Sequence, residues 1–171
     1  QEEHMLRELA RLRDWLGACF IPMVEVMEKK VMLKVHHDFD TLFQKWFMML
    51  VDTEVMKIRL DEQFSPVIEQ NGYEIDYGFL SGGEKTAAAL AYRLALNQVV
   101  NSILSTIKTR GLLILDEPTD GFSSEQLDRM RDLLDELDAE QIILVSHEAK
   151  MESFVNSVIR VEKQEHVSKV V

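Results

Sequence analysis

Two short runs dominated by apolar residues, with an amphipathic helical pattern between them, constrain the fold of this chain most. They are "LLIL" at 112–115 and "QIILVS" at 141–146. The helix predicted between them, "SSEQLDRMRDLLDEL", turns one apolar side inward, formed by Leu127, Met130, Leu134 and Leu137. Strands that are apolar on both faces are typical of parallel sheets covered by helices. The order strand, helix, strand therefore predicts an α/β fold with two buried parallel strands.

A small antiparallel β unit is predicted before this α/β part. "VMKIRL" at 55–60 alternates apolar and polar residues, and "YEIDY" at 73–77 places Tyr73, Ile75 and Tyr77 on one face. Asn71-Gly72 is a strong signal for a tight turn. We therefore expect "SPVIEQNGYEIDY" to form a β-hairpin.

The first 50 residues have a helical pattern. An apolar seam with the a/d spacing of a coiled coil is formed by Met5, Leu9, Leu12, Leu16, Cys19, Met23 and Val26. An amphipathic helix of a globular domain has the same spacing, and we expect Pro22 to interrupt the helix. A second helical stretch has a crowded apolar face for the domain core or a partner helix, formed by Phe39, Leu42, Phe43, Trp46, Phe47 and Leu50.

The remaining elements are predicted from shorter patterns. A helix should begin near Ser81 and continue through "EKTAAALAYRLALNQVV". A short helix should follow the strand at 141–146, and "SVIRVE" (157–162) and "HVSKVV" (166–171) should be closing strands. We place a domain boundary between a helical segment, 1–52, and a lobe formed by 53–171.

Asp116 and Glu117 directly follow the first apolar strand. α/β proteins bind ligands at this carboxyl edge of the sheet. Two adjacent acids point different ways from an extended chain, so they suit separate tasks. Asp116 can hold Mg²⁺ through water, and Glu117 can orient and deprotonate an attacking water. A solvated turn is the simpler interpretation of such a pair.

His147 follows the second apolar strand, at the same predicted edge as Asp116. It can donate an imidazole N–H to a terminal phosphate, or it can be a structural histidine. His36, His37 and Asp38 are adjacent, but they have no recognisable metal-ligand spacing.

"FLSGGEKTAAAL" at 79–90 combines a helix cap with paired glycines. Ser81 and Glu84 have the spacing of a capping box, which alone would explain a helix start. Gly82 and Gly83 also allow the backbone to approach an anion that the helix dipole stabilises. However, no glycine in the chain is followed by lysine, so the phosphate loop G-x-x-x-x-G-K-[ST] is absent.

Composition limits the remaining classes. The net charge of −11 disfavours a broad electrostatic platform for nucleic acid. The longest apolar runs, such as "WFMMLV" at 46–51, are shorter than the roughly 18 residues of a membrane span. No secretion signal is recognised, and a single cysteine, Cys19, fits a reducing compartment. We therefore expect a cytoplasmic protein, and the abrupt helical opening suggests a fragment boundary.

Three motifs together resemble the ABC-type ATPases. "LSGGEK" (80–85), "LLILDEPTD" (112–120) and "ILVSH" (143–147) are similar to the signature motif, the Walker B strand and the switch histidine of that family. Glutamate after the glycines resembles the SMC-like branch. Within that branch, "DEPT" and the helix "LAYRLAL" look like the double-strand-break repair ATPases of the Rad-fifty/SbcC family. This resemblance implies an α/β P-loop NTPase fold of ABC-ATPase type.

The resemblance further implies that the chain is the C-terminal half of an ATPase head. The N-terminal half would carry the phosphate loop, and residues 5–26 would be the base of a returning antiparallel coiled coil whose apex binds Zn²⁺ outside this chain. Two heads would form an ATP-dependent homodimer. A nuclease of the metallophosphoesterase type would dock near residues 5–50, where Trp15, Phe20, Phe43 and Trp46 supply apolar surface. Double-stranded DNA would bind to the assembled complex in a prokaryotic nucleoid.

The resemblance also implies roles for single residues, with ATP and Mg²⁺ as ligands. Asp116 is similar to the Mg²⁺ residue, Glu117 to the catalytic base and His147 to the γ-phosphate contact. The signature residues expected at ATP held by the opposite protomer are Ser81, Gly82 and Gly83. Glu84, Lys85 and Asp120 are further expected ATP-binding residues, and Asp120 can substitute for the D-loop aspartate. Phe122-Ser123 stand where the family's D-loop usually has Leu-Asp.

Three other functions stay open at this stage. The coiled-coil entry and the signature glutamate argue against the ATPase domain of an ABC transporter, and "EPTDGF" argues against an SMC-type chromosome organiser. A non-catalytic interaction module would leave Glu117 idle.

Overall fold

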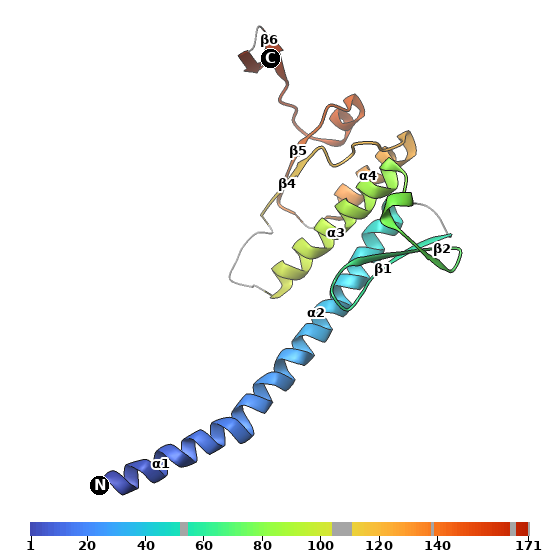
Figure 1. Cartoon of the computed structure of the whole chain (residues 1–171). Helices are drawn as coiled ribbons and strands as arrows, with labels where there is room; N and C mark the ends of the chain where they lie inside the picture. Colours follow the sequence, from blue (N-terminus) through green and yellow to red (C-terminus); the bar gives the residue numbers. More distant parts are fainter. Residues whose placement is uncertain (52–54, 104–110, 138, 165–166, 171) are drawn as a thin grey trace.

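The protein combines a long helical arm with a smaller packed body (Figure 1). The structure is a computed structural model that describes all residues except 52–54, 104–110, 138, 165–166 and 171. The arm consists of α1 (Glu2–Trp15), the π-helical turn η1 (Leu16–Phe20) and α2 (Ile21–Leu50). The proposed domain boundary at 52/53 lies outside the described residues. Among the described residues, no helix is long and apolar enough to cross a membrane.

Pro22 does not interrupt the arm, so that prediction was wrong. The N–H of Ile21 donates to the carbonyl of Leu16, five residues back, and Pro22 then lies in the first turn of α2. Proline is tolerated there because its missing N–H would have no helical partner. The π-turn adds one residue, which advances every following side chain by one position. The exposed apolar residues after this turn include Met23 and Val26 of the predicted seam and also Val24, Met27 and Val31.

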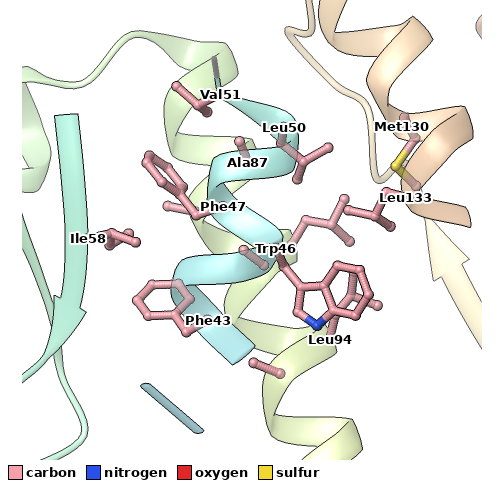
Figure 2. Packing of buried hydrophobic residues seen from close by; sticks show 14 of the residues in the cluster. Phe43, Trp46, Phe47, Leu50, Val51, Ile58, Ala87, Leu94, Met130 and Leu133 are labelled. Atoms are coloured by element: carbon pink, nitrogen blue, oxygen red, sulfur yellow. The ribbon is translucent and has the colours of Figure 1, made fainter. Parts of the chain in front are cut away.

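The body is built around the last turns of α2. Its buried aromatic residues are Phe39, Phe43, Trp46 and Phe47. Figure 2 shows Phe43, Trp46 and Phe47 between Ile58 of β1 (Met56–Leu60), Ala87 and Leu94 of α3 (Gly82–Ile103), and Met130 and Leu133 of α4 (Ser124–Glu136). The predicted packing face is confirmed as a core face. Phe43 and Trp46 are 0% and 1% exposed, so their expected place in a partner surface was wrong, whereas Trp15 and Phe20 are exposed.

The small antiparallel unit is confirmed as the sheet β1, β2 (Pro66–Gln70) and β3 (Tyr73–Ile75), in that order. Met56 pairs with Gln70, and Gln70 pairs with Tyr73. The turn residues Asn71 and Gly72 have φ of 53° and 82°, as a type I′ turn requires. β3 ends before Tyr77, which lies in the 3₁₀ helix η2 (Tyr77–Phe79), so the five-residue strand was predicted too long.

The predicted strand–helix–strand unit forms, but its strands are not fully buried. β4 (Leu112–Asp116) pairs in parallel with β5 (Gln141–Val145), and α4 connects them. Leu113, Leu115 and Leu144 pack on the core. The opposite face is exposed and consists of Leu112, Ile114, Ile143 and Val145. Burial on both faces requires a layer on each side, and the described residues provide only one.

The C-terminal part extends beyond this sheet (Figure 1). The predicted short helix is the 3₁₀ helix η3 (Ala149–Phe154), and the closing hairpin consists of β6 (Val161–Gln164) and β7 (Val167–Val170). Residues 157–160 are not part of a strand, so the first closing strand begins later than predicted. Arg160 donates two hydrogen bonds to Glu152, and these lower the pKa of that carboxyl.

Candidate functional site

The acid pair lies at the carboxyl end of β4, as the sequence predicts. Asp116 is the last residue of the strand, opposite Val145 of β5, and its side chain is exposed. The N–H of Glu117 donates to the carbonyl of Val145 over 2.8 Å. Glu117 has a φ of 44°, in the left-handed region that residues other than glycine rarely adopt. Strained backbone of this kind persists where surrounding contacts hold it, and it clusters at functional sites.

His147 contacts Glu117 directly. Nδ1 of His147 lies 2.9 Å from Oε2 of Glu117, and its Nε2 lies 4.0 Å from Oε1 of Glu148. An Nδ1–H that donates to the carboxylate explains the shorter contact. Because Glu117 and His147 follow neighbouring parallel strands, the sheet brings together two side chains that are 30 residues apart in the sequence.

The N-terminus of α3 is closed by the predicted capping box. The N–H of Ser81 donates to Oε2 of Glu84 over 2.7 Å, and the N–H of Glu84 donates to Oγ of Ser81 over 3.3 Å. The N–H of Lys85 then donates to the carbonyl of Ser81. The Glu84 side chain is thereby committed to the cap. The N–H groups of Gly82 and Gly83, in the first turn, are not needed for it.

The two glycines of this turn have different surroundings. Gly82 is exposed, and a Cβ built on it would meet nothing within 4 Å. Gly83 is buried, and a Cβ built on it would lie 2.6 Å from Oε1 of Gln126 and 2.8 Å from the carbonyl oxygen of Gly121. Open space for an anion therefore exists at Gly82, whereas Gly83 permits a close contact within the chain.

Lys85 is directed away from this helix start. Its Nζ donates to the carbonyl of Gly78 over 3.0 Å, and its own carbonyl accepts from the Tyr77 hydroxyl. These contacts fix the preceding 3₁₀ helix against α3. Sequence reasoning did not identify Tyr77 and Gly78 as its partners.

The loop after the acids (residues 117–123) is folded into consecutive turns. The N–H of Asp120 donates to the carbonyl of Glu117, and the N–H of Phe122 donates to that of Thr119. Asp120 is exposed, whereas Thr119 is buried, and its Oγ1 is the buried side-chain polar atom without a hydrogen-bond partner among the described residues. Gly121, with a φ of 76°, lies against Gly82 and Gly83. The acid loop and the start of α3 are therefore neighbours.

A capping box at α4 was missed in the sequence. The N–H of Gln126 donates to Oγ of Ser123, and the N–H of Ser123 donates to Oε1 of Gln126. The spacing Ser-x-x-Gln before an amphipathic run is the signal that could have identified it.

The donor set fits Mg²⁺ only in combination with a ligand. The described residues include no group of three histidine, cysteine or acidic side chains that could hold a metal ion. Mg²⁺ is usually bound by one or two carboxylates together with waters and substrate phosphates. The exposed carboxylate of Asp116 meets that requirement.

No protein-family model matches the chain. Among curated proteins, it is similar to the DNA double-strand break repair Rad50 ATPase of Thermococcus kodakarensis, with 36% identity over 129 residues, 74% of this chain and 13% of the relative. The protein of the same name from Thermoplasma acidophilum is 29% identical over 166 residues, 94% of this chain and 17% of the relative. The chain thus spans less than one fifth of these relatives' length.

Solved structures of Smc head domains share the fold. One from Pyrococcus yayanosii, with a coiled coil and joint, has a TM-score of 0.71 and 22% identity, covering 99% of this chain and 34% of that one. One from Pyrococcus furiosus, with an extended coiled coil and bound to the C-terminal domain of ScpA, has a TM-score of 0.69 and 23% identity, covering 99% and 44%. These likenesses confirm the fold predicted from the sequence.

Proposed function

The chain belongs to the Rad50 family of SMC-like ABC-type ATPases, and from this premise we propose that it is the C-terminal half of an ATP-hydrolysing head in DNA double-strand-break repair. The observation that carries the proposal is the 2.9 Å contact of His147 with Glu117, at the start of the loop whose Gly121 lies against the start of α3. The names of the curated relatives support repair over chromosome organisation, because the Smc structures are less than 25% identical and speak for the fold alone.

The acids and the histidine act on ATP held by the same head. Asp116 would hold Mg²⁺, and the ion would supply positive charge that neutralises the phosphates. Glu117 accepts a proton from the attacking water. His147 keeps the Glu117 carboxylate oriented through Nδ1. With both ring nitrogens protonated, its Nε2–H donates to the γ-phosphate.

The start of α3 acts on ATP held by the opposite head. Ser81 and Gly82 lie at an exposed helix N-terminus, where backbone N–H groups and the helix dipole favour an anion. Glu84 maintains the cap, Lys85 fixes the preceding turn, and the exposed Asp120 faces outward from the neighbouring loop. ATP shared between two heads stabilises the closed dimer, and hydrolysis removes that stabilisation.

The uncovered surfaces support a head completed by another segment of the same protein. The exposed apolar face of the β4–β5 sheet would be costly in water as a free surface. We propose that the N-terminal half, which supplies the phosphate loop, covers it. The apolar stripe of α1 and α2 then packs against the outgoing strand of an antiparallel coiled coil.

The remaining partners are assigned to the arm and to the assembled complex. Trp15 and Phe20 are exposed, with ring centroids 5.9 Å apart, and offer apolar surface for a metallophosphoesterase-type nuclease. We assign the binding of double-stranded DNA to the assembled complex and not to this chain alone, because the net charge of this chain is −11.

The test is the association of assembled heads, measured by size-exclusion chromatography with light scattering. Heads should be monomeric without nucleotide and dimeric with ATP. Equal dimerisation with and without ATP, or no dimerisation under either condition, would reject the proposal.

A further inference from the structure

Gly83 is the point where α3 contacts the acid loop. The Gln126 carboxamide and the Gly121 carbonyl both approach it so closely that no side chain could fit between them. Gly82, one residue earlier, has open space around it. Close packing within the chain therefore accounts for the second glycine, while phosphate access concerns the first.

Gln126 is held in this position by its own hydrogen bonds. The side-chain Oε1 of Gln126 accepts from the backbone N–H of Ser123 over 3.0 Å, while the backbone N–H of Gln126 donates to Oγ of Ser123 over 3.2 Å. The same Oε1 is the atom that lies closest to the Cβ position of Gly83. The carboxamide is thus fixed by the N–H of Ser123, the backbone of Gln126 is fixed by the Ser123 hydroxyl, and the carboxamide lies against the first turn of α3.

The loop that reaches this contact begins at the proposed base. Gly121 is four residues after Glu117, and the two intervening turns are closed by hydrogen bonds to the carbonyls of Glu117 and Thr119. Glu117 is itself tied to Val145 of β5. A connection through the turns of the acid loop therefore runs from the start of α3, at Gly82 and Gly83, to the backbone of Glu117.

We propose that Gln126 is a positioning residue that fixes the start of α3 and the acid loop of one head as a single rigid unit. The proposal rests on the proposed function, because Gln126 would connect the start of α3, which contacts the ATP of the opposite head, with the acids that act on the ATP of its own head. Without the Gln126 carboxamide, the start of α3 is less well aligned with the ATP of the opposite head. The acid loop is also less well aligned with the ATP that this head hydrolyses.

Mixed dimers of the full-length protein test this, with two affinity tags used to purify heads of different sequence. The reference pairs a wild-type head with a Glu117→Gln head, so that only one site hydrolyses ATP. In the first arrangement, Gln126→Ala is placed on the head that keeps Glu117. In the second, it is placed on the Glu117→Gln head, whose α3 contacts the active site. Maximal ATP turnover is measured at saturating ATP and at a protein concentration where light scattering shows complete dimerisation, so that weaker association does not contribute.

Turnover should fall about fivefold or more in both arrangements, within the usual range of coupling between sites. If turnover falls in only one arrangement, Gln126 serves either the α3 contact or the acid loop alone, and the proposal is overturned. Unchanged turnover in both arrangements also overturns it. Gln126→Glu retains the oxygen that accepts from Ser123 and should restore most of the rate. Asp132→Ala, an exposed change on the same helix, controls for a general effect on α4. Absence of turnover in the wild-type dimer would instead reject the ATPase function and this inference with it.

Discussion

Nδ1 of His147 lies 2.9 Å from Oε2 of Glu117, which joins the residues that follow β4 and β5 across the end of the sheet. The contact fixes the Glu117 carboxylate at a backbone position with a φ of 44°. In its proposed role as the base, Glu117 would therefore need little rearrangement before it accepts a proton from water.

Glu117→Gln should abolish most ATP turnover of the assembled head while ATP still binds, because an amide cannot accept the proton. We expect a loss of about 10²-fold or more in maximal rate, with the ATP-bound dimer accumulating. Turnover and light scattering measure the two effects. Glu148→Gln is the matched control, since that carboxylate lies 4.0 Å from the same imidazole and should be dispensable. Normal turnover in Glu117→Gln would remove it as the base.

Ser81→Arg should abolish ATP-dependent dimerisation, because the long cation would occupy the space where the opposite ATP approaches Gly82. The change also removes the cap of α3, which costs about 1 kcal/mol of stability. Ser81→Ala removes the same cap without the added bulk, so it should lower the melting temperature similarly and still dimerise more strongly than Ser81→Arg. Equal dimerisation by the wild type and Ser81→Arg would contradict a role for this surface in trans.

Gly82→Ala and Gly83→Ala should separate the two glycines. The first adds a methyl group to open space and should leave the melting temperature of the nucleotide-free head nearly unchanged, although ATP-dependent dimerisation weakens. The second adds a methyl group that pushes Gly121 and Gln126 away from residue 83, and it should lower the unfolding free energy by about 1–3 kcal/mol. Thermal denaturation of both variants decides, and similar melting temperatures would count against the close contact at Gly83.

Thr119→Val tests the buried hydroxyl of the acid loop. Because Oγ1 has no hydrogen-bond partner among the described residues, replacing it with a methyl group should leave the unfolding free energy unchanged or raise it by about 1 kcal/mol. Thr119→Ala, which leaves a small cavity, should instead lower it. Denaturant unfolding of the assembled head measures both, and a large loss in Thr119→Val would mean that the hydroxyl has a partner there.

The local pattern of the sequence predicted most of the elements because each pattern had a physical cause. Asn71-Gly72 supplied the two positive φ values of the hairpin turn, and Ser81 with Glu84 formed the expected cap. The place of His147 at the same sheet edge as Asp116 followed from the rule that parallel strands end at one edge of a sheet, whereas its contact with Glu117 was not predicted.

What the sequence did not predict depended on contacts between distant segments. The exposed face at Ile114 and Val145 was not predicted. The apolar composition of a strand shows that the strand can be buried, but it does not show whether the same chain supplies the covering layer. Pro22 remained within the helix because a π-turn precedes it, and periodicity alone gives no sign of that turn. The roles of Gly82 and Gly83 differ because α4 packs on only one of them.

ATP turnover by the purified chain, with and without the N-terminal half of the same protein, tests the central claim most directly. The chain has acids and a helix start for phosphate but lacks the G-x-x-x-x-G-K-[ST] loop. We predict no turnover and no ATP binding by the chain alone, and ATP turnover when the two halves are combined. Turnover by the chain alone, or a combined head that remains inactive, would contradict the account.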